Sequence, residues 1–456
     1  MPQLSVPFKP ASVLGSSGFF RLAQSEAGQW WLLDPLGAPF FSKGVGAVSR
    51  TGAAEGRSTR PGKYAAMVNE LYGEEDPSIF VRSVAQRLRN WNLNTLGAWT
   101  GPEFFDQGIY YTELIEFRKV GPSFHSGEAR LPDVFDPAWR DAADAWAREI
   151  CSPRQNSTEL IGYFTDHELG WAQPTPYPAD GIVPADAKKE APSLLQICLS
   201  LEPSFRAYHA AWEFILAPRQ GSLERLSLDW DVPIVNREII RQMTQADTAI
   251  VTNGYRVDQD RFAQEFARRY FSTCAAVIRH YDPNHLILGC RFAEYPGDAI
   301  VSQCAAPHVD VLSMRPDRED WDRTAQRVFA ETGTPVLLTE LSWSSAAFAR
   351  APIKREKRRL TSLERMLAKG RLYLERVFEH RGIVGYEWAR WVDAEDEQPP
   401  FASGLVHLDD REALEHTELL ADLNRRAESL RLKAAGSSRV PERGCSGSWS
   451  AGVPPA

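Results

Sequence analysis

The sequence lacks the spaced cysteine and histidine patterns that mark structural metal sites. Its 6 cysteines are scattered over 456 residues without a Cys-x-x-Cys pair, and its 9 histidines include no His-x-His pair. Zinc sites and disulfide frameworks are recognised by such spacing, and neither is indicated. The cysteines are expected to be reduced and mostly buried. We therefore expect no bound metal and no cofactor.

The glycine-rich motifs of nucleotide-binding folds are also missing. No Gly-x-Gly-x-x-Gly follows an apolar strand, and no Gly-x-x-x-x-Gly-Lys-Ser/Thr occurs. The 52 Lys and Arg residues are outnumbered by 60 Asp and Glu residues, which gives a formal net charge of -8. The basic block at 354–359 is interpreted as a solvated helix face. No nucleic-acid partner is expected.

Long hydrophobic runs do not occur. A membrane-spanning helix needs about 18 or more consecutive apolar residues, and the sequence has no such stretch. Residues 1–7 show no basic region followed by an apolar one, as a signal peptide would. The sequence therefore predicts a cytoplasmic protein without a membrane partner, or a secreted or periplasmic one if a signal peptide was removed. It is compatible with a homo-oligomer.

Short apolar strands alternate with amphipathic helices along most of the chain. Eight segments have the character of buried parallel strands: 39–48, 93–100, 110–117, 160–164, 285–292, 309–314, 335–340 and 382–388. Helical patterns lie between most of them, at 77–90, 136–151, 258–280, 321–332 and 363–379. This alternation predicts the α/β class and a (β/α)8 TIM barrel. A doubly wound open sheet is the alternative, and the missing glycine motifs disfavour it.

Three segments depart from the alternation. Residues 1–38 contain two strand-like runs around a turn and predict a small β-hairpin packed on the barrel. The stretch 173–250 predicts a long insertion after the fourth strand, within a barrel of residues 39–433. Residues 434–456 are dominated by Gly, Ser and Pro and are expected to form a disordered tail.

The fourth and seventh predicted strands each end in a glutamate. These are Glu168 and Glu340, and a tryptophan, Trp171 or Trp343, follows each of them three residues later. Catalytic side chains of such barrels lie at the carboxyl ends of strands, so the two glutamates would face each other across the mouth. Two carboxyl groups are what hydrolysis of a glycosidic bond requires. The alternative is that each glutamate only pairs with an arginine.

Other side chains at predicted strand ends are candidates for substrate contacts. Trp388 is favoured as the floor on which a sugar ring stacks, with core packing as its alternative. Asp166 is assigned a structural role and a sugar contact with equal weight. Asn94 is interpreted mainly as a partner of backbone groups, and Arg291 mainly as an ion-pair partner of a catalytic carboxylate. The remaining candidates are Trp99, Trp171 and Trp343.

Several short motifs occur along the chain. None of them is unique, but their order is hard to obtain by chance. They are Trp30-Trp31-Leu32-Leu33-Asp34-Pro35, Asn92-Leu93-Asn94-Thr95-Leu96-Gly97, Ile161-Gly162-Tyr163-Phe164, Asp282-Pro283-Asn284-His285, Thr339-Glu340 and Gly385-Tyr386. Over roughly residues 19–430 the chain resembles the agarase-like catalytic domains of glycoside hydrolase family 50, within the clan of retaining barrel glycosidases. The resemblance implies that Glu168 is the acid/base and Glu340 the nucleophile.

Two positions depart from the pattern of that clan. His167 stands where the clan usually has an asparagine that contacts the sugar 2-hydroxyl. Arg315 stands near the place where the sixth strand usually brings an aromatic hydroxyl, and we expect it to orient Glu340. Both residues are therefore candidates for substrate binding and for setting the sugar specificity.

The sequence thus predicts a retaining glycoside hydrolase for β-linked galactan or agarose-type oligosaccharides, with an oligosaccharide or polysaccharide as its partner. One alternative is a retaining β-glycosidase for another sugar, such as a β-glucoside or β-mannoside. A second is a non-catalytic carbohydrate-binding barrel, although both glutamates are present. A metal-dependent barrel hydrolase ranks below these because the histidines lack the required spacing.

Overall fold

A computed structural model describes residues 10–52, 62–105, 107–126, 129–170, 191–293, 295–315, 321–344, 361–395 and 402–437. Trp171, the basic block at 354–359 and residues 438–456 lie outside this description. So do residues 172–190, which include the first part of the insertion predicted at 173–250. Within the described residues, no helix combines the length and apolar character needed to cross a membrane.

Eight parallel strands close into a barrel, which confirms the predicted fold. In chain order they are β5 (Ser42–Val45), β6 (Thr95–Leu96), β7 (Tyr110–Leu114), β10 (Leu160–His167), β11 (Leu286–Phe292), β12 (Leu312–Met314), β13 (Val336–Leu341) and β14 (Ile383–Trp388). Each overlaps one of the predicted strands. All residues of β10, β11 and β14 are buried, as expected for strands covered on both faces.

The floor of the barrel is filled by apolar side chains from the strands and from a small N-terminal sheet. Ile161, Leu286, Leu337 and their neighbours form one buried cluster with Phe20 and Phe40. The sheet has four antiparallel strands, β1 (Pro10–Leu14), β2 (Arg21–Ser25), β3 (Trp30–Leu33) and β4 (Pro39–Phe40). The sequence predicted only a hairpin, because the residues of β1 are all exposed and carry no apolar pattern.

In the described part of the chain, seven helices surround the barrel or extend from it. They are α1 (Lys63–Tyr72), α2 (Pro77–Asn90), α3 (Pro137–Cys151), α8 (Asn253–Tyr281), α9 (Trp321–Thr332), α11 (Ser362–Glu379) and α12 (Leu414–Ser437). Asp76 and Asp136 cap α2 and α3 ahead of a proline in the first turn. Thr361 and Glu364 form a capping box at α11. Helix α12 runs on to Ser437, so it includes the first residues of the segment predicted to be disordered.

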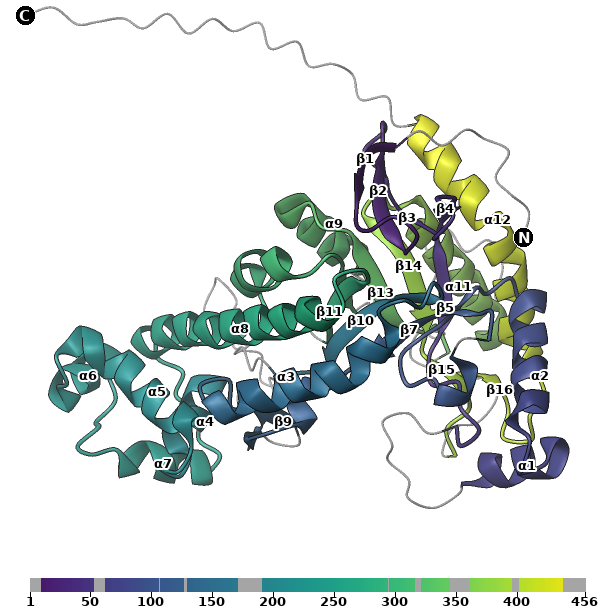
Figure 1. Ribbon diagram of the computed structural model, residues 1–456. Helices are drawn as coiled ribbons and strands as arrows, with labels where there is room; N and C mark the ends of the chain where they lie inside the picture. The colour runs from purple at the N-terminus through teal and green to yellow at the C-terminus, as the bar shows by residue number, and fades with distance from the viewer. Residues whose placement is uncertain are drawn as a thin grey trace, which may run out of the picture.

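Four further helices pack at the far end of α8, which is 29 residues long. They are α4 (Leu194–Ser200), α5 (Arg206–Leu216), α6 (Leu223–Trp230) and α7 (Glu238–Gln245). Figure 1 shows them, in teal, on the side of the molecule away from the barrel strands. The described part of the insertion is therefore a helical projection.

Short elements complete the described chain. Two small sheets pair β8 (Ser123–Ser126) with β9 (Ala129–Pro132) and β15 (Arg390–Val392) with β16 (Gly404–Val406). The short helices are η1 (Pro102–Phe104), η2 (Phe117–Lys119), η3 (Ser152–Arg154), η4 (Ala217–Arg219), η5 (Ile300–Ala305) and η6 (Ala306–His308).

Candidate active site

Glu168 and Glu340 meet at the carboxyl ends of the fourth and seventh barrel strands, β10 and β13. An oxygen of each carboxylate lies within 4.8 Å of the other and of a nitrogen of His167. Their backbones are left-handed, with φ of 46° at Glu168 and 56° at Glu340. Non-glycine residues are held in that region at some energetic cost, and such positions cluster at functional sites. The turn of the backbone aims both side chains at the same point.

His167 lies between the two carboxylates. Its Nε2 is 3.5 Å from Oε1 of Glu168 and 3.6 Å from Oε1 of Glu340. The imidazole is buried and packs edge-on against the ring of Trp99, with 4.7 Å between centroids. The guanidinium of Arg118 donates a hydrogen bond to its carbonyl oxygen. The residue that stands in place of the usual asparagine is thus held firmly in the centre of the site.

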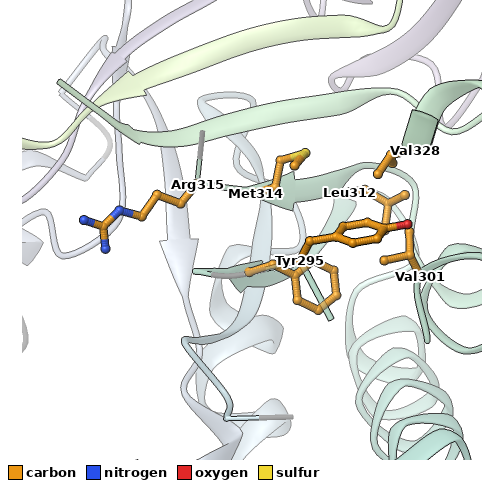
Figure 2. Close-up of a pocket in the computed structure, with 7 residues that line it drawn as sticks. Tyr295, Val301, Leu312, Met314, Arg315 and Val328 are labelled. Carbon is orange, nitrogen blue, oxygen red and sulfur yellow. The ribbon is translucent and has the colours of Figure 1, made fainter. Parts of the chain in front are cut away.

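Arg315 reaches the same two carboxylates from the end of β12. Its Nη1 is 3.3 Å from Oε1 of Glu168 and 3.7 Å from Oε2 of Glu340. The sequence predicted that Arg315 orients Glu340, and it contacts both glutamates. Figure 2 shows its guanidinium pointing away from the apolar pocket beside it, which Tyr295, Met314 and other side chains line. The side chain of Arg315 is 53% exposed, so this contact to the two carboxylates lies on the solvent side of the site.

A buried ion pair lies deeper in the barrel. Nη2 of Arg291 is 3.3 Å from Oε2 of Glu387, and Thr112 donates a hydrogen bond to the other oxygen of Glu387. The Arg291 guanidinium lies over the ring of Trp99 at 4.5 Å. Burial raises the pKa of Glu387, and the negative charge of Glu340 adds to that shift. Arg291 therefore pairs with Glu387. The sequence had suggested a pair with Glu168 or Glu340, and this prediction was wrong.

Glu387 was not among the site residues predicted from the sequence, where it was interpreted as a structural residue inside the eighth strand. A side chain added at Gly97 would come within 2.9 Å of its carboxylate, and one at Gly44 within 3.3 Å of its Cγ. The absence of side chains at these two glycines therefore leaves room for the Glu387 carboxylate inside the barrel. Gly44, on the first barrel strand, and Gly97, just after the second, are the sequence features that could have indicated a buried carboxylate there.

Asp166 belongs to the wall of the barrel and not to the mouth. It is fully buried, and it accepts hydrogen bonds from the Tyr270 hydroxyl of α8 and from the backbone N–H of Arg118. Burial is the main cause that raises its pKa to about 7. Of the two roles weighed for Asp166, the structure supports the structural one.

The two tryptophans that follow β13 and end β14 pack inside the protein. Trp388 is 0% exposed, donates a hydrogen bond from Nε1 to the carbonyl of Ser403, and meets Trp343 edge-on at 4.6 Å. A side chain at Gly370 would clash with the ring of Trp343, at 2.6 Å, so α11 approaches that ring closely. Neither ring presents a face to a sugar in this structure, which corrects the prediction of a stacking floor.

The remaining candidates divide between the site and the framework. Trp99, with a left-handed backbone at φ 60°, lies against His167 and Arg291 and is part of the site. Asn94 precedes β6, where its side chain accepts from the backbone N–H of Lys43 and donates to the carbonyl of Phe41. It serves the backbone at the start of the strand, away from the carboxyl ends where the site is built. Trp171 lies outside the described residues.

The arrangement can carry out acid–base and nucleophilic chemistry on one bond. The nearest oxygens of the two carboxylates are at most 4.8 Å apart, which is compatible with the about 5–5.5 Å between the carboxyl groups of retaining glycosidases, whereas inverting enzymes leave at least about 6.5 Å for a water. Among the described residues, His167, Glu168 and Glu340 also form a group whose ligand atoms lie close enough together to hold one metal ion. Carboxylate and imidazole are ordinary ligands of transition metals.

Two curated proteins are similar to this chain in sequence. Beta-agarase A of Vibrio sp. (strain JT0107) is 24% identical over 438 residues, which cover 84% of this chain and 42% of the relative. Beta-agarase B of the same strain is 22% identical over 450 residues, covering 84% of this chain and 45% of the relative. The chain thus spans less than half the length of either. No known family profile matches the sequence.

Solved structures show the same fold. A structure described as PfGH50B has a TM-score of 0.68 at 18% identity and covers 94% of this chain and 68% of its own. An agarase, AgWH50C, has a TM-score of 0.68 at 19% identity, covering 92% and 66%. An exo-beta-agarase has a TM-score of 0.65 at 18% identity, again covering 92% and 66%. At this identity the likeness concerns the barrel architecture.

Proposed function

We propose that this protein is a retaining glycoside hydrolase that cleaves β-linked galactan or agarose-type oligosaccharides by double displacement. The observation that carries the proposal is the pair Glu168 and Glu340, whose oxygens lie within 4.8 Å across the mouth of the barrel. That separation suits attack by one carboxylate and not the insertion of a water between them. The similar beta-agarases support the sugar class.

The first step forms a covalent intermediate. Glu340 attacks the anomeric carbon, and the bond to the leaving oxygen breaks as Glu168 donates its proton to that oxygen. Glu340 is the better placed nucleophile because its side chain is 18% exposed, against 37% for Glu168. The more exposed Glu168 can meet both the leaving group and an incoming water.

The second step releases the sugar. Glu168, now a carboxylate, takes a proton from a water that attacks the anomeric carbon, and Glu340 leaves as a carboxylate. Arg315 and His167 touch both carboxylates in the resting site, so they fix the geometry in which each carboxylate acts. Positioning of this kind is a large part of the rate enhancement in enzymes.

Substitution of Glu340 tests the proposal. Chromogenic β-galactosides and agaro-oligosaccharides are incubated with the wild type and with Glu340→Ala. The wild type should release product, and the variant should lose activity by at least about 10⁴-fold, as expected for removal of a nucleophile that acts together with an acid. Azide should restore turnover to Glu340→Ala, because it replaces the missing nucleophile.

Two other outcomes decide between the alternatives. Cleavage of β-glucosides or β-mannosides but not of galactosides would keep the mechanism and change the sugar. Binding of agaro-oligosaccharides in calorimetry, with no cleavage of any glycoside, would replace the proposal by a carbohydrate-binding barrel. The cytoplasmic location and the homo-oligomer stay predictions of the sequence.

A further inference from the structure

The active-site carboxylates share their centre with a buried imidazole. His167, Glu168 and Glu340 each bring one ligand atom to a common point, and all three atoms lie within 4.8 Å of one another. A histidine nitrogen with two carboxylate oxygens is a ligand set found in transition-metal sites. The sequence predicted no metal site, because the ligands come from two strands that lie far apart in the chain.

We propose that His167, Glu168 and Glu340 form a binding site for a divalent transition-metal ion, with Zn²⁺ as the preferred ion, and that the bound ion blocks the proposed hydrolysis. Metal binding itself does not rest on the proposed function, whereas the inhibition does. The ion would be a reversible inhibitor that competes with substrate. It would take no part in the reaction.

The separations between ligand atoms fit a tetrahedral ion. With metal–ligand bonds of about 2.0–2.2 Å, tetrahedral ligands lie roughly 3.3–3.6 Å apart. Nε2 of His167 is 3.5 Å from Oε1 of Glu168 and 3.6 Å from Oε1 of Glu340, so two of the three edges already have this length. The third edge closes by rotation of the partly exposed Glu168 side chain, and a water completes the shell.

The imidazole is oriented toward the centre before any ion arrives. It is 5% exposed, its ring packs against Trp99, and Arg118 holds its carbonyl oxygen. A ligand that loses little freedom on binding raises affinity. A nitrogen ligand also selects Zn²⁺ and related ions over Mg²⁺ and Ca²⁺, which prefer all-oxygen sites.

In the resting site, the Arg315 guanidinium occupies the position next to the two carboxylates that the ion would take. Its guanidinium neutralises the same carboxylates from 3.3 and 3.7 Å, and its side chain is the most exposed of the group, at 53%. The incoming ion must displace this charge toward solvent. Removal of Arg315 should therefore strengthen metal binding, while removal of His167 should weaken it.

The experiment measures binding of ZnCl₂ to chelator-treated full-length protein by titration calorimetry, without any substrate. We expect one ion per chain, and affinity lower by more than about tenfold in His167→Asn and in Glu340→Gln, since loss of even an outer-shell partner costs that much. Arg315→Gln should bind more tightly than the wild type. His209→Asn, the same exchange at an exposed histidine of α5, is the matched control and should bind as the wild type does.

A second readout identifies the ligands. Co²⁺ in the same protein should give visible absorption bands of a tetrahedral or five-coordinate ion, and these bands should vanish in His167→Asn. Absence of binding in the wild type, or equal binding in His167→Asn, would overturn the proposal. Calorimetry and Co²⁺ spectra report on the site whether or not the protein cleaves sugars. If it does, Zn²⁺ and not Ca²⁺ should inhibit, and a chelator should restore activity.

Discussion

At the scale of single residues, the site is built from two charged layers. The upper layer contains Glu168, Glu340 and the two side chains that bridge them, His167 and Arg315. The lower layer is the buried pair of Arg291 and Glu387. Charges inside a protein need partners because desolvation is costly. The Glu387 carboxylate of the lower layer lies close enough to Glu340 for the two charges to interact.

Removal of the Glu387 charge should destabilise the protein. Glu387→Gln leaves the guanidinium of Arg291 buried without its counter-charge, and breaking such a pair costs about 3–5 kcal/mol. Thermal and urea unfolding measure the loss. The double variant Arg291→Met with Glu387→Leu should be more stable than Glu387→Gln, because it removes both charges together. Equal stability of Glu387→Gln and the wild type would contradict this account.

The residue scale also shows the limit of prediction from sequence. The pattern of a carboxylate at a strand end identified Glu168 and Glu340. The sequence pattern did not tell which face of β14 points into the barrel. The Tyr386 hydroxyl donates to Asn424 of α12, so Tyr386 faces the helices. By alternation Glu387 then faces the barrel interior, and Trp388 faces outward. The prediction of Trp388 as a sugar platform failed on this point.

At the scale of elements, β10 explains why the site could be predicted only in part. Its pairing with β11 shifts register between Tyr163 and Phe164 and again before His167. Simple alternation is lost at such irregularities, so the sequence cannot say whether Asp166 or His167 points inward. The eight strands themselves were predictable, because buried parallel strands are continuous apolar runs. Their closure follows from eight such units in one chain.

Asp166 should make stability depend on pH. Its pKa is raised to about 7, whereas an unfolded Asp titrates near about 4. Between these values the folded state holds the proton more often, so its stability rises as the pH falls from about 7 toward about 4. Because one pKa unit is worth about 1.4 kcal/mol, the gain relative to Asp166→Asn should be on the order of a few kcal/mol.

The measurement compares the two proteins over that range. Unfolding free energies of the wild type and Asp166→Asn are determined at several pH values, so that the contributions of all other groups cancel in the difference. The difference should shift in favour of the wild type on acidification. Parallel curves would show that the pKa of Asp166 is not raised in the folded protein.

At the scale of the whole molecule, the N-terminal sheet and the barrel share one core. Phe20 meets Phe40 at 5.1 Å and Tyr110 of β7 at 4.8 Å. Phe20 and Phe40 belong to the cluster that fills the barrel floor, and Tyr110 packs against it. We propose that the sheet, predicted as a separate segment of residues 1–38, unfolds together with the barrel of residues 39–433.

Truncation of the shared core should destabilise the barrel. Phe20→Ala removes a fully buried ring and should cost about 3–5 kcal/mol. Leu36→Ala, in the same N-terminal region but 93% exposed, is the matched control and should change stability by less than about 0.5 kcal/mol. Calorimetry should show one transition that moves down in Phe20→Ala. A second, separate transition for the sheet would contradict a common core.

The central claim is that Glu168 and Glu340 cleave a β-glycosidic bond with retention. The most direct test is the anomeric configuration of the sugar first released from an agaro-oligosaccharide or β-galactoside, followed by proton NMR before mutarotation. The spacing of the two carboxylates, within 4.8 Å, predicts that the β-anomer appears first and the α-anomer only later. Initial release of the α-anomer, or no cleavage at all, would contradict the account.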